Sequence, residues 1–113
     1  MTGAELREWC RSMPGAVEEF PFSPGTSVFK IAGKVFALSR LGEKPMKVSL
    51  KCEPTLGESL RASYDAIVPG YHLNKKHWLT ITLGADAGDQ MVMDLIQDSY
   101  DLVKPKRRRG AAG

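Results

Sequence analysis

The chain has 113 residues, of which 42% are hydrophobic and 26% are charged. This length and composition indicate one globular domain, and they exclude a disordered chain and a fibrous repeat. No segment has the roughly 20 consecutive apolar residues of a membrane-spanning helix, and residues 1–13 carry acidic groups where a secretion signal has an apolar core. We therefore expect a cytoplasmic protein that does not act in a membrane.

The net charge of +3 comes from the C-terminal end of the chain. Residues 104–113 contain five of the 16 basic residues and no acidic one, so residues 1–103 carry eleven basic against 13 acidic residues, a net charge of −2. We expect a single domain over residues 1–104 and a basic, flexible tail over residues 105–113, because the tail has like charges and no apolar groups to bury. Nucleic-acid affinity of the domain itself must then come from local clusters of cations.

The first half of the chain predicts a helix followed by strands. Thr2 and Glu5 have the spacing of a capping box, and the helix that they begin ends at Pro14. Its apolar face consists of Leu6, Trp9, Cys10 and Met13. Aromatic and β-branched residues then alternate with polar ones, which predicts strands over residues 17–21, 27–31, 34–40 and 46–51. The two-residue break at Ala32 and Gly33 favours a tight hairpin between the second and third of these strands.

The second half of the chain predicts two helices separated by one strand. Pro54 begins a helix that we expect to run through residues 55–67. Residues 78–83 alternate as a strand, in which Trp78 shares a face with the two threonines. Asp89 is expected to cap the last helix. This order has too few crossover helices for a parallel sheet, so we predict an α+β fold, a two-layer sandwich of an antiparallel sheet with the helices on one face.

The run from Val68 to Leu83, VPGYHLNKKHWLTITL, contains both histidines, one of two tryptophans and a pair of lysines. Phosphate binding needs cations and hydrogen-bond donors, and the turn at residues 72–78 supplies both. Strand lysines and the arginines of the tail could add to it. The candidate nucleic-acid-binding residues are Lys30, Lys34, Lys47, Lys51, His72, Asn74, Lys75, Lys76, His77, Trp78, Arg107, Arg108 and Arg109. The alternative explanation for the strand lysines is that they protect the sheet from aggregation.

The same turn lacks the pattern of a metal site. The five-residue separation of His72 and His77 fits neither a helical i, i+4 pair nor alternate positions on a strand, and no Cys, Asp or Glu lies between them. We expect no metal and no cofactor. The chain also has no nucleophile elbow, phosphate loop or paired-carboxylate motif, so we expect a non-enzymatic protein without catalytic residues. The ring of His77 is expected to hold the turn by hydrogen bonds to the backbone.

The two cysteines are expected to be free thiols, because a small domain of intracellular type with so few cysteines usually keeps them reduced. Cys10 follows Trp9 on the first helix and is expected to pack as a small apolar group. Lys51 directly precedes Cys52 and is expected to lower the pKa of that thiol.

Four segments carry a resemblance to a known family: EFPFSPGTSVFKIAGKVFAL, VSLKCEP, VPGYHLNKKHWLTITL and SYDLV. From about residue 5 to residue 103, the chain resembles the MmcQ/YjbR family of small bacterial proteins in the order of these motifs. It has Lys-Lys before His77 where the family often has Lys-Arg, which keeps the cation. The resemblance implies a CyaY-like sandwich, the bacterial frataxin type, related to the double-wing DNA-binding domain of a phage transcription activator.

We therefore expect a DNA-binding protein that contacts phosphates through the turn at residues 72–78, the neighbouring lysines and the basic tail. One alternative is a protein-interaction or small-ligand-binding module, in which the same turn forms the mouth of a pocket and His72, Asn74 and Trp78 orient the partner. A third interpretation is an enzyme of a kind that the motifs do not reveal. The sequence gives no oligomeric state.

Overall fold

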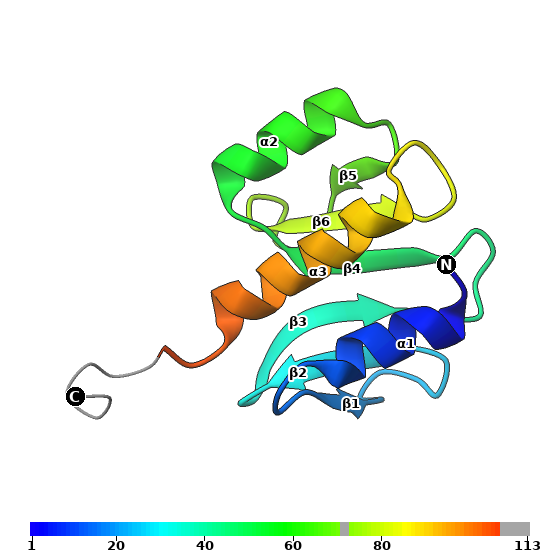
Figure 1. Ribbon diagram of the computed structural model, residues 1–113, viewed down its shortest axis with the longest axis vertical. Coiled ribbons are helices and arrows are strands. Elements are labelled where there is room, and N and C mark those ends of the chain that lie inside the picture. The colour runs from blue at the N-terminus through cyan, green and yellow to red at the C-terminus, as the bar shows by residue number, and fades with distance from the viewer. Residues whose placement is uncertain (71–72, 107–113) are drawn as a thin grey trace.

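The computed structural model of the chain describes residues 1–70 and 73–106. Of the candidate binding residues, His72, Arg107, Arg108 and Arg109 lie outside the described residues. In chain order, the helices and strands are α1 (Gly3–Ser12), β1 (Val17–Glu19), β2 (Ser27–Ile31), β3 (Lys34–Ser39), β4 (Lys47–Lys51), α2 (Pro54–Ser63), β5 (Ile67–Pro69), β6 (Trp78–Thr82) and α3 (Asp89–Val103). The strands form one antiparallel sheet in the order β1-β2-β3-β4-β6-β5 (Figure 1), which confirms the predicted α+β class.

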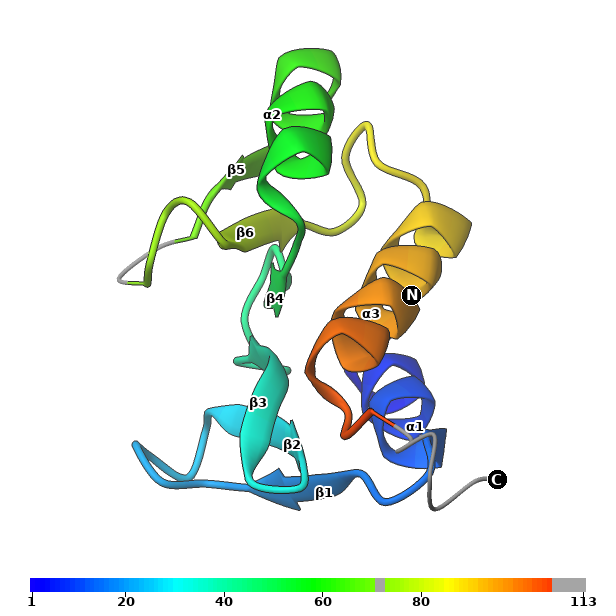
Figure 2. The same cartoon turned by 90° about the vertical axis from the view of Figure 1, so that its left-hand side faces the viewer.

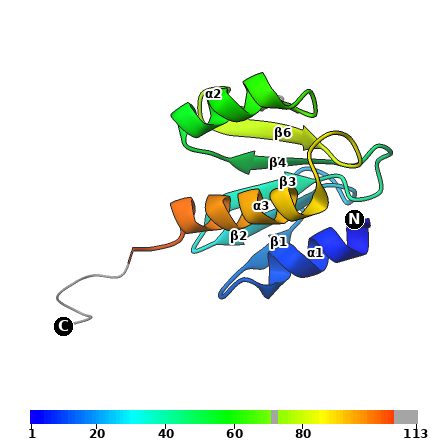
Figure 3. The ribbon, with the colours of Figure 1, turned by 45° about the horizontal axis from the view of Figure 1, so that its top comes forward.

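The helices pack on one side of this sheet. Figure 2 shows α1 and α3 on the same side, and Figure 3 shows α3 lying along β3 between the other two helices. The backbone of Gly57 in α2 lies against the side chain of Leu79 in β6, so α2 covers the β5–β6 end of that side. The largest fully buried side chains between the two layers are Phe29, Phe36, Leu6, Leu50, Leu79, Ile81 and Ile96. Among the described residues, no helix has the length and apolar run needed to cross a membrane.

Strand β3 has an irregularity that α3 accommodates. The register of β2 against β3 shifts, and Phe36 and Ala37 are both buried. Ser99 of α3 is fully buried, donates its hydroxyl proton to the carbonyl oxygen of Phe36 at 2.6 Å, and accepts the N–H of Lys51 at 2.8 Å. One hydroxyl group from the helix layer is therefore the hydrogen-bond partner of a backbone group in each of two neighbouring strands, at the point where the pairing of β3 with β4 ends.

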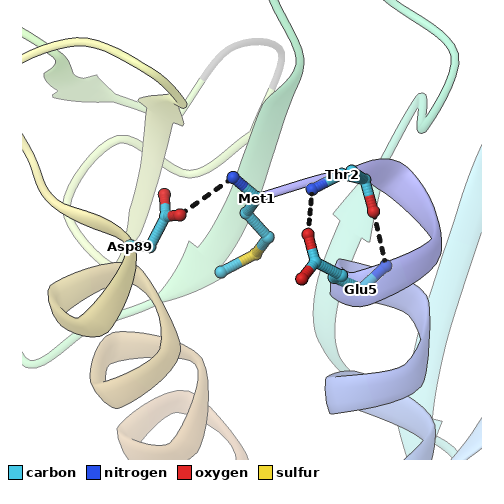
Figure 4. Close-up of polar contacts among 4 residues, drawn as sticks. All are labelled: Met1, Thr2, Glu5 and Asp89. Carbon is cyan, nitrogen blue, oxygen red and sulfur yellow. Dashed lines mark hydrogen bonds and ion pairs between the residues drawn. The ribbon is translucent and has the colours of Figure 1, made fainter.

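The starts of α1 and α3 meet at the beginning of the chain (Figure 4). The predicted capping box is confirmed, because the N–H of Glu5 donates to the Thr2 hydroxyl at 3.1 Å and the N–H of Thr2 donates to the Glu5 carboxylate at 2.7 Å. The prediction that Asp89 caps α3 is wrong, since Gly88 is the N-cap and Asp89 is the first helical residue. The Asp89 carboxylate instead binds the α-amino group of Met1 at 2.8 Å, which raises the pKa of that amine.

The segment after α2 differs from the prediction. The helix expected over residues 55–67 ends at Ser63, and the residues that follow the next turn form the edge strand β5. The carboxylate of Asp86, about twenty residues further along the chain, accepts the N–H groups of Asp65 and Ala66 at 2.7 and 2.8 Å. These two hydrogen bonds hold the backbone in a turn where a helix would continue, and they lower the pKa of Asp86 below its ordinary value.

Both cysteines are free, as predicted, and both are buried. Burial raises the pKa of Cys10 to about 12. Burial also raises the pKa of Cys52, and the charges of Glu53 and Asp98 act in the same direction. The prediction that Lys51 lowers the pKa of Cys52 is therefore wrong, because consecutive residues at the end of a strand point to opposite sides of the sheet.

Candidate nucleic-acid interface

The side of the sheet that the helices leave uncovered, hereafter the open face, carries most of the candidate strand lysines (Figure 2). Directly paired residues of neighbouring strands point to the same side, and successive residues alternate between sides. Lys51 of β4 is paired with Trp78 of β6, and Lys47 lies four residues earlier on the same side as Lys51. Lys30 follows the fully buried Phe29, so it points away from the helices as well. These three lysines and Trp78 therefore share the open face.

Lys34 lies on the other side of the sheet. It is paired with Ile31, which is buried on the helix side, although Lys34 itself is exposed. The predicted tight turn between β2 and β3 is confirmed, since Ala32 and Gly33 have φ values of 51° and 80°, the left-handed region that two-residue hairpin turns require. The hairpin places Lys34 near Lys30 in space but not on the open face.

The middle of the open face is uncharged. Val28, Leu38, Ser49, Thr80 and Val68 are successive cross-strand neighbours from β2 to β5. The hydroxyl groups of Ser49 and Thr80 are hydrogen-bonded to each other at 2.8 Å. Val28, Ser49 and Thr80 are buried, with 1%, 7% and 6% of their surfaces exposed, whereas Leu38 is half-buried and Val68 is 45% exposed. The lysines therefore border a neutral strip, hereafter the central row, and do not occupy it.

The turn before β6 is held by Asn74. Its side-chain oxygen accepts the N–H of Lys76 at 2.9 Å, and its carbonyl oxygen accepts the N–H groups of His77 and Trp78 at 3.3 and 2.9 Å. Asn74 therefore holds the turn through three hydrogen bonds to the backbone, and hydrogen bonds from the His77 ring stay a prediction. The side chains of Lys75, Lys76 and His77 are exposed, and this turn presents them to the solvent beside the open face.

Lysines from several segments gather at one end of the molecule. Figure 1 shows that the β2–β3 hairpin, the end of β4, the turn at residues 73–77 and the end of α3 all lie at this end. Each of these segments carries a lysine, namely Lys34, Lys51, Lys75 and Lys104. The described part of the basic tail thus leaves the domain at the same end as the candidate turn.

The acidic residues lie mainly on the helical side. Seven of the 13 are in helices, four of them in α3. Glu18 of β1 points to the helix side, where its carboxylate binds Arg7 at 3.0 Å and Ser27 at 2.6 Å. Among the strand residues that the structure describes, Glu19 is the one acid on the open face, and it pairs with Lys30 at 2.9 Å. The open face therefore carries three strand lysines against one strand acid, whereas the helical side carries both acids and arginines.

Two exposed aromatic side chains beside the open face were not among the predicted site residues. Strand β1 ends at Glu19, and the segment that joins it to β2 projects on the side of the open face, as the turn at residues 73–77 does (Figure 2). In this segment Phe20 is 48% exposed and Phe22 is 75% exposed. The neighbouring residues indicate this exposure, because the sequence F-P-F-S-P-G has the composition of a turn, and large apolar side chains in a surface turn are not packed in the core.

Two hollows lie away from the turn. One is on the outer surface of α1, and the other, of about 300 Å³, lies between the start of α2 and the end of α3. Neither is lined by residues 73–78, so a pocket mouth at the turn stays a prediction. Within the described ranges, no group of three His, Cys, Asp or Glu side chains is placed to hold a metal ion.

Comparisons with known proteins agree on one family. The YjbR family model matches residues 11–102. The uncharacterized protein YbdF of Escherichia coli O157:H7 is 40% identical over 84 residues, which are 74% of this chain and 69% of that protein. The uncharacterized protein YjbR of Escherichia coli is 34% identical over 100 residues, 88% of this chain and 85% of that protein.

Solved structures show the same fold. The fold is similar to that of protein DR2400 of Deinococcus radiodurans, family-model domain DUF419, with a TM-score of 0.88 and 38% identity, covering 96% of this chain and 83% of that one. A protein from Pseudomonas syringae has a TM-score of 0.78 and 27% identity, covering 92% of this chain and 100% of that one. The similarity to these structures covers nearly the whole described domain.

Proposed function

The chain belongs to the YjbR family, and from the geometry of its open face we propose that it binds DNA through the phosphate groups. The observation that carries the proposal is that Lys30, Lys47 and Lys51 share the side of the sheet that the helices leave uncovered. Lys75 and Lys76 extend this set of cations from the neighbouring turn.

The distribution of charge allows a domain of net charge −2 to attract a polyanion. Binding of phosphates is driven by cations that replace the counterions of the nucleic acid. Lys47 and Lys51 are about 13 Å apart along β4, at about 3.3 Å per residue, so each can neutralise a different phosphate. The acids of the three helices lie on the other side of the sheet, where the sheet separates them from a ligand on the open face.

The family relationship supports DNA as the ligand, since the family resembles a double-wing DNA-binding domain. The segment between β1 and β2 and the turn at residues 73–77 project on the open side, at opposite ends of the sheet (Figures 1 and 2), so the two segments flank a nucleic acid that is bound on the open face. Similarity of fold is by itself a weak argument for function, so the position of the lysines carries the proposal.

A salt titration tests the proposal. Fluorescence anisotropy with a labelled duplex of about 20 base pairs should give an affinity that falls steeply between about 50 and 300 mM NaCl. Lys47→Glu and Lys76→Glu should each weaken binding and reduce the slope of log K against log salt by about 0.9, the value expected for one lost phosphate contact. The matched control is Arg11→Glu, which makes the same charge change at an exposed position on α1 and should leave affinity within about twofold at a Debye length of about 8 Å.

Deletion of residues 106–113 separates the domain from its tail. The shortened chain should keep a salt-dependent affinity that Lys47→Glu still weakens. Loss of all binding in the shortened chain would assign the affinity to the tail and overturn the proposal, and so would equal losses in Arg11→Glu and Lys47→Glu.

A further inference from the structure

Two phenylalanines are exposed in a segment that is otherwise well structured. Phe20 and Phe22 lie between β1 and β2, with 48% and 75% of their surfaces exposed. The segment is closed by hydrogen bonds between Ser23 and Thr26, one between their side chains at 3.0 Å and one from the Thr26 N–H to the Ser23 carbonyl at 3.2 Å. Proline at position 21 and a Pro-Gly pair further restrict the backbone. The aromatic side chains are thus presented to the solvent by a rigid segment, which lowers the entropy cost of using them for binding.

A third aromatic side chain lies at the opposite end of the strands. Trp78 is half-buried at the start of β6, on the open face, directly opposite Lys51. The turn that precedes Trp78 and the segment that carries Phe20 and Phe22 both project from the open side, at opposite ends and near opposite edges of the sheet (Figures 1 and 2). A ligand that crosses the open face diagonally can therefore meet aromatic groups at both of its ends.

The central row between these corners suits bases better than phosphates. Its members from Val28 to Val68 are uncharged, and its two hydroxyl-bearing residues, Ser49 and Thr80, are hydrogen-bonded to each other. A duplex presents phosphates on its outside and requires cations where it makes closest contact. A single strand can turn its bases toward neutral and aromatic side chains while its phosphates reach cations at the margins. The open face has this second pattern, with lysines bordering a neutral row.

We propose that the open face binds single-stranded nucleic acid, with bases stacked on Phe20, Phe22 and Trp78 and phosphates neutralised by the bordering lysines. The inference rests on the proposed function, because it takes the same lysines as the phosphate contacts and adds the class of nucleic acid. The central row crosses the sheet from β2 to β5 through four strand spacings of about 4.8 Å, roughly 19 Å, which suits a short site within the range of about 4–16 nucleotides that one small β domain occupies.

Four labelled probes of equal length test the inference at one salt concentration: oligo-dT of about 12 nucleotides, the corresponding oligo-rU, an abasic strand with the same backbone, and a duplex. Oligo-dT or oligo-rU should bind at least about tenfold more tightly than the abasic strand and the duplex, because only strands with unpaired bases can stack. The comparison of dT with rU shows whether the ligand is DNA or RNA.

The double variant Phe20→Ala and Phe22→Ala should weaken binding of the preferred strand by between about fivefold and a hundredfold and leave its salt dependence unchanged, because stacking is lost and the phosphate contacts remain. The control Leu102→Ala truncates another exposed apolar side chain, 50% exposed on α3, and should have no effect. A cooperative thermal unfolding transition for each variant shows that a loss of binding does not come from misfolding.

The outcomes separate the two proposals. Equal affinities for duplex, abasic strand and oligo-dT, with no effect of the phenylalanine substitutions, would overturn the single-strand inference while the binding of phosphates by the open face stands. Absence of salt-dependent binding to all four probes would overturn both.

Discussion

The hydroxyl group of Ser99 offers a sharp test of how the two layers are joined. Ser99 is fully buried, and its hydroxyl connects the carbonyl oxygen of Phe36 at 2.6 Å with the N–H of Lys51 at 2.8 Å. Ser99→Ala removes that group and leaves one acceptor and one donor of the main chain without their partner. An unsatisfied buried polar group costs about 1–3 kcal/mol, and the bond to Lys51 is only partly buried, so we expect a loss of about 2–4 kcal/mol in the free energy of unfolding.

Thermal and urea unfolding measure this loss. With an unfolding entropy of about 2.1 cal/mol/K per residue over 113 residues, a loss of about 2–4 kcal/mol corresponds to a fall in Tm of about 8–17 °C. The control is Ser59→Ala, an exposed serine in α2, for which we expect a change within about 0.5 kcal/mol. A change of that small size for Ser99→Ala would refute the reasoning, because it would mean that neither strand depends on the hydroxyl group.

Two further predictions concern thiol reactivity and acid stability. Burial raises the pKa of Cys10 to about 12 and also raises that of Cys52, so neither thiol should react with DTNB at pH 8 as fast as free cysteine does. Both thiols should react at once in denaturant. Rapid labelling of one thiol in the folded protein, assigned with the variants Cys10→Ser and Cys52→Ser, would contradict this prediction. The hydrogen bonds from Ala66 and Asp65 lower the pKa of Asp86, so its contribution to stability is complete above the ordinary value of 3.8 and is lost as the pH falls through the folded pKa. The Tm of Asp86→Asn should therefore be below that of the parent protein at pH 5–7, and the difference should shrink below about pH 3.8; a difference that does not depend on pH would argue against a role for the charge.

Much of the fold could be predicted from local patterns. Strands β2, β3, β4 and β6 have alternating apolar residues, and α1 has a capping box, so each could be located from a few neighbouring residues. Strand β5 could not, because it has three residues including Pro69 and owes its position to Asp86, which is distant in sequence. The role of Asp89 was missed for the same reason, since its partner is the α-amino group of Met1, 88 residues away.

The candidate surface was predictable in part. Lys47 and Lys51 were expected on one side of one strand, because side chains alternate between the two sides along a strand. The two-residue turn pairs Lys34 with Ile31 and not with Lys30, so the predicted hairpin already implied that these two lysines lie on different sides of the sheet, although both were named as candidates for one surface. Phe20 was predicted to lie in the strand over residues 17–21 because aromatic residues favour strands, and the earlier end of β1 at Glu19 was not visible in the pattern.

The two margins of the sheet restrict how the domain can associate with other chains. Both outer strands, β1 and β5, have only three residues. Pro69 in β5 has no N–H to offer a further strand, and β1 carries two adjacent glutamates, Glu18 and Glu19. Edge strands that are short, charged or interrupted by proline disfavour backbone pairing of the sheet with the sheet of another copy. The domain should therefore stay free of strand-swapped assemblies even at high concentration, and we expect its contacts with other chains to use side chains and not the backbone of the sheet.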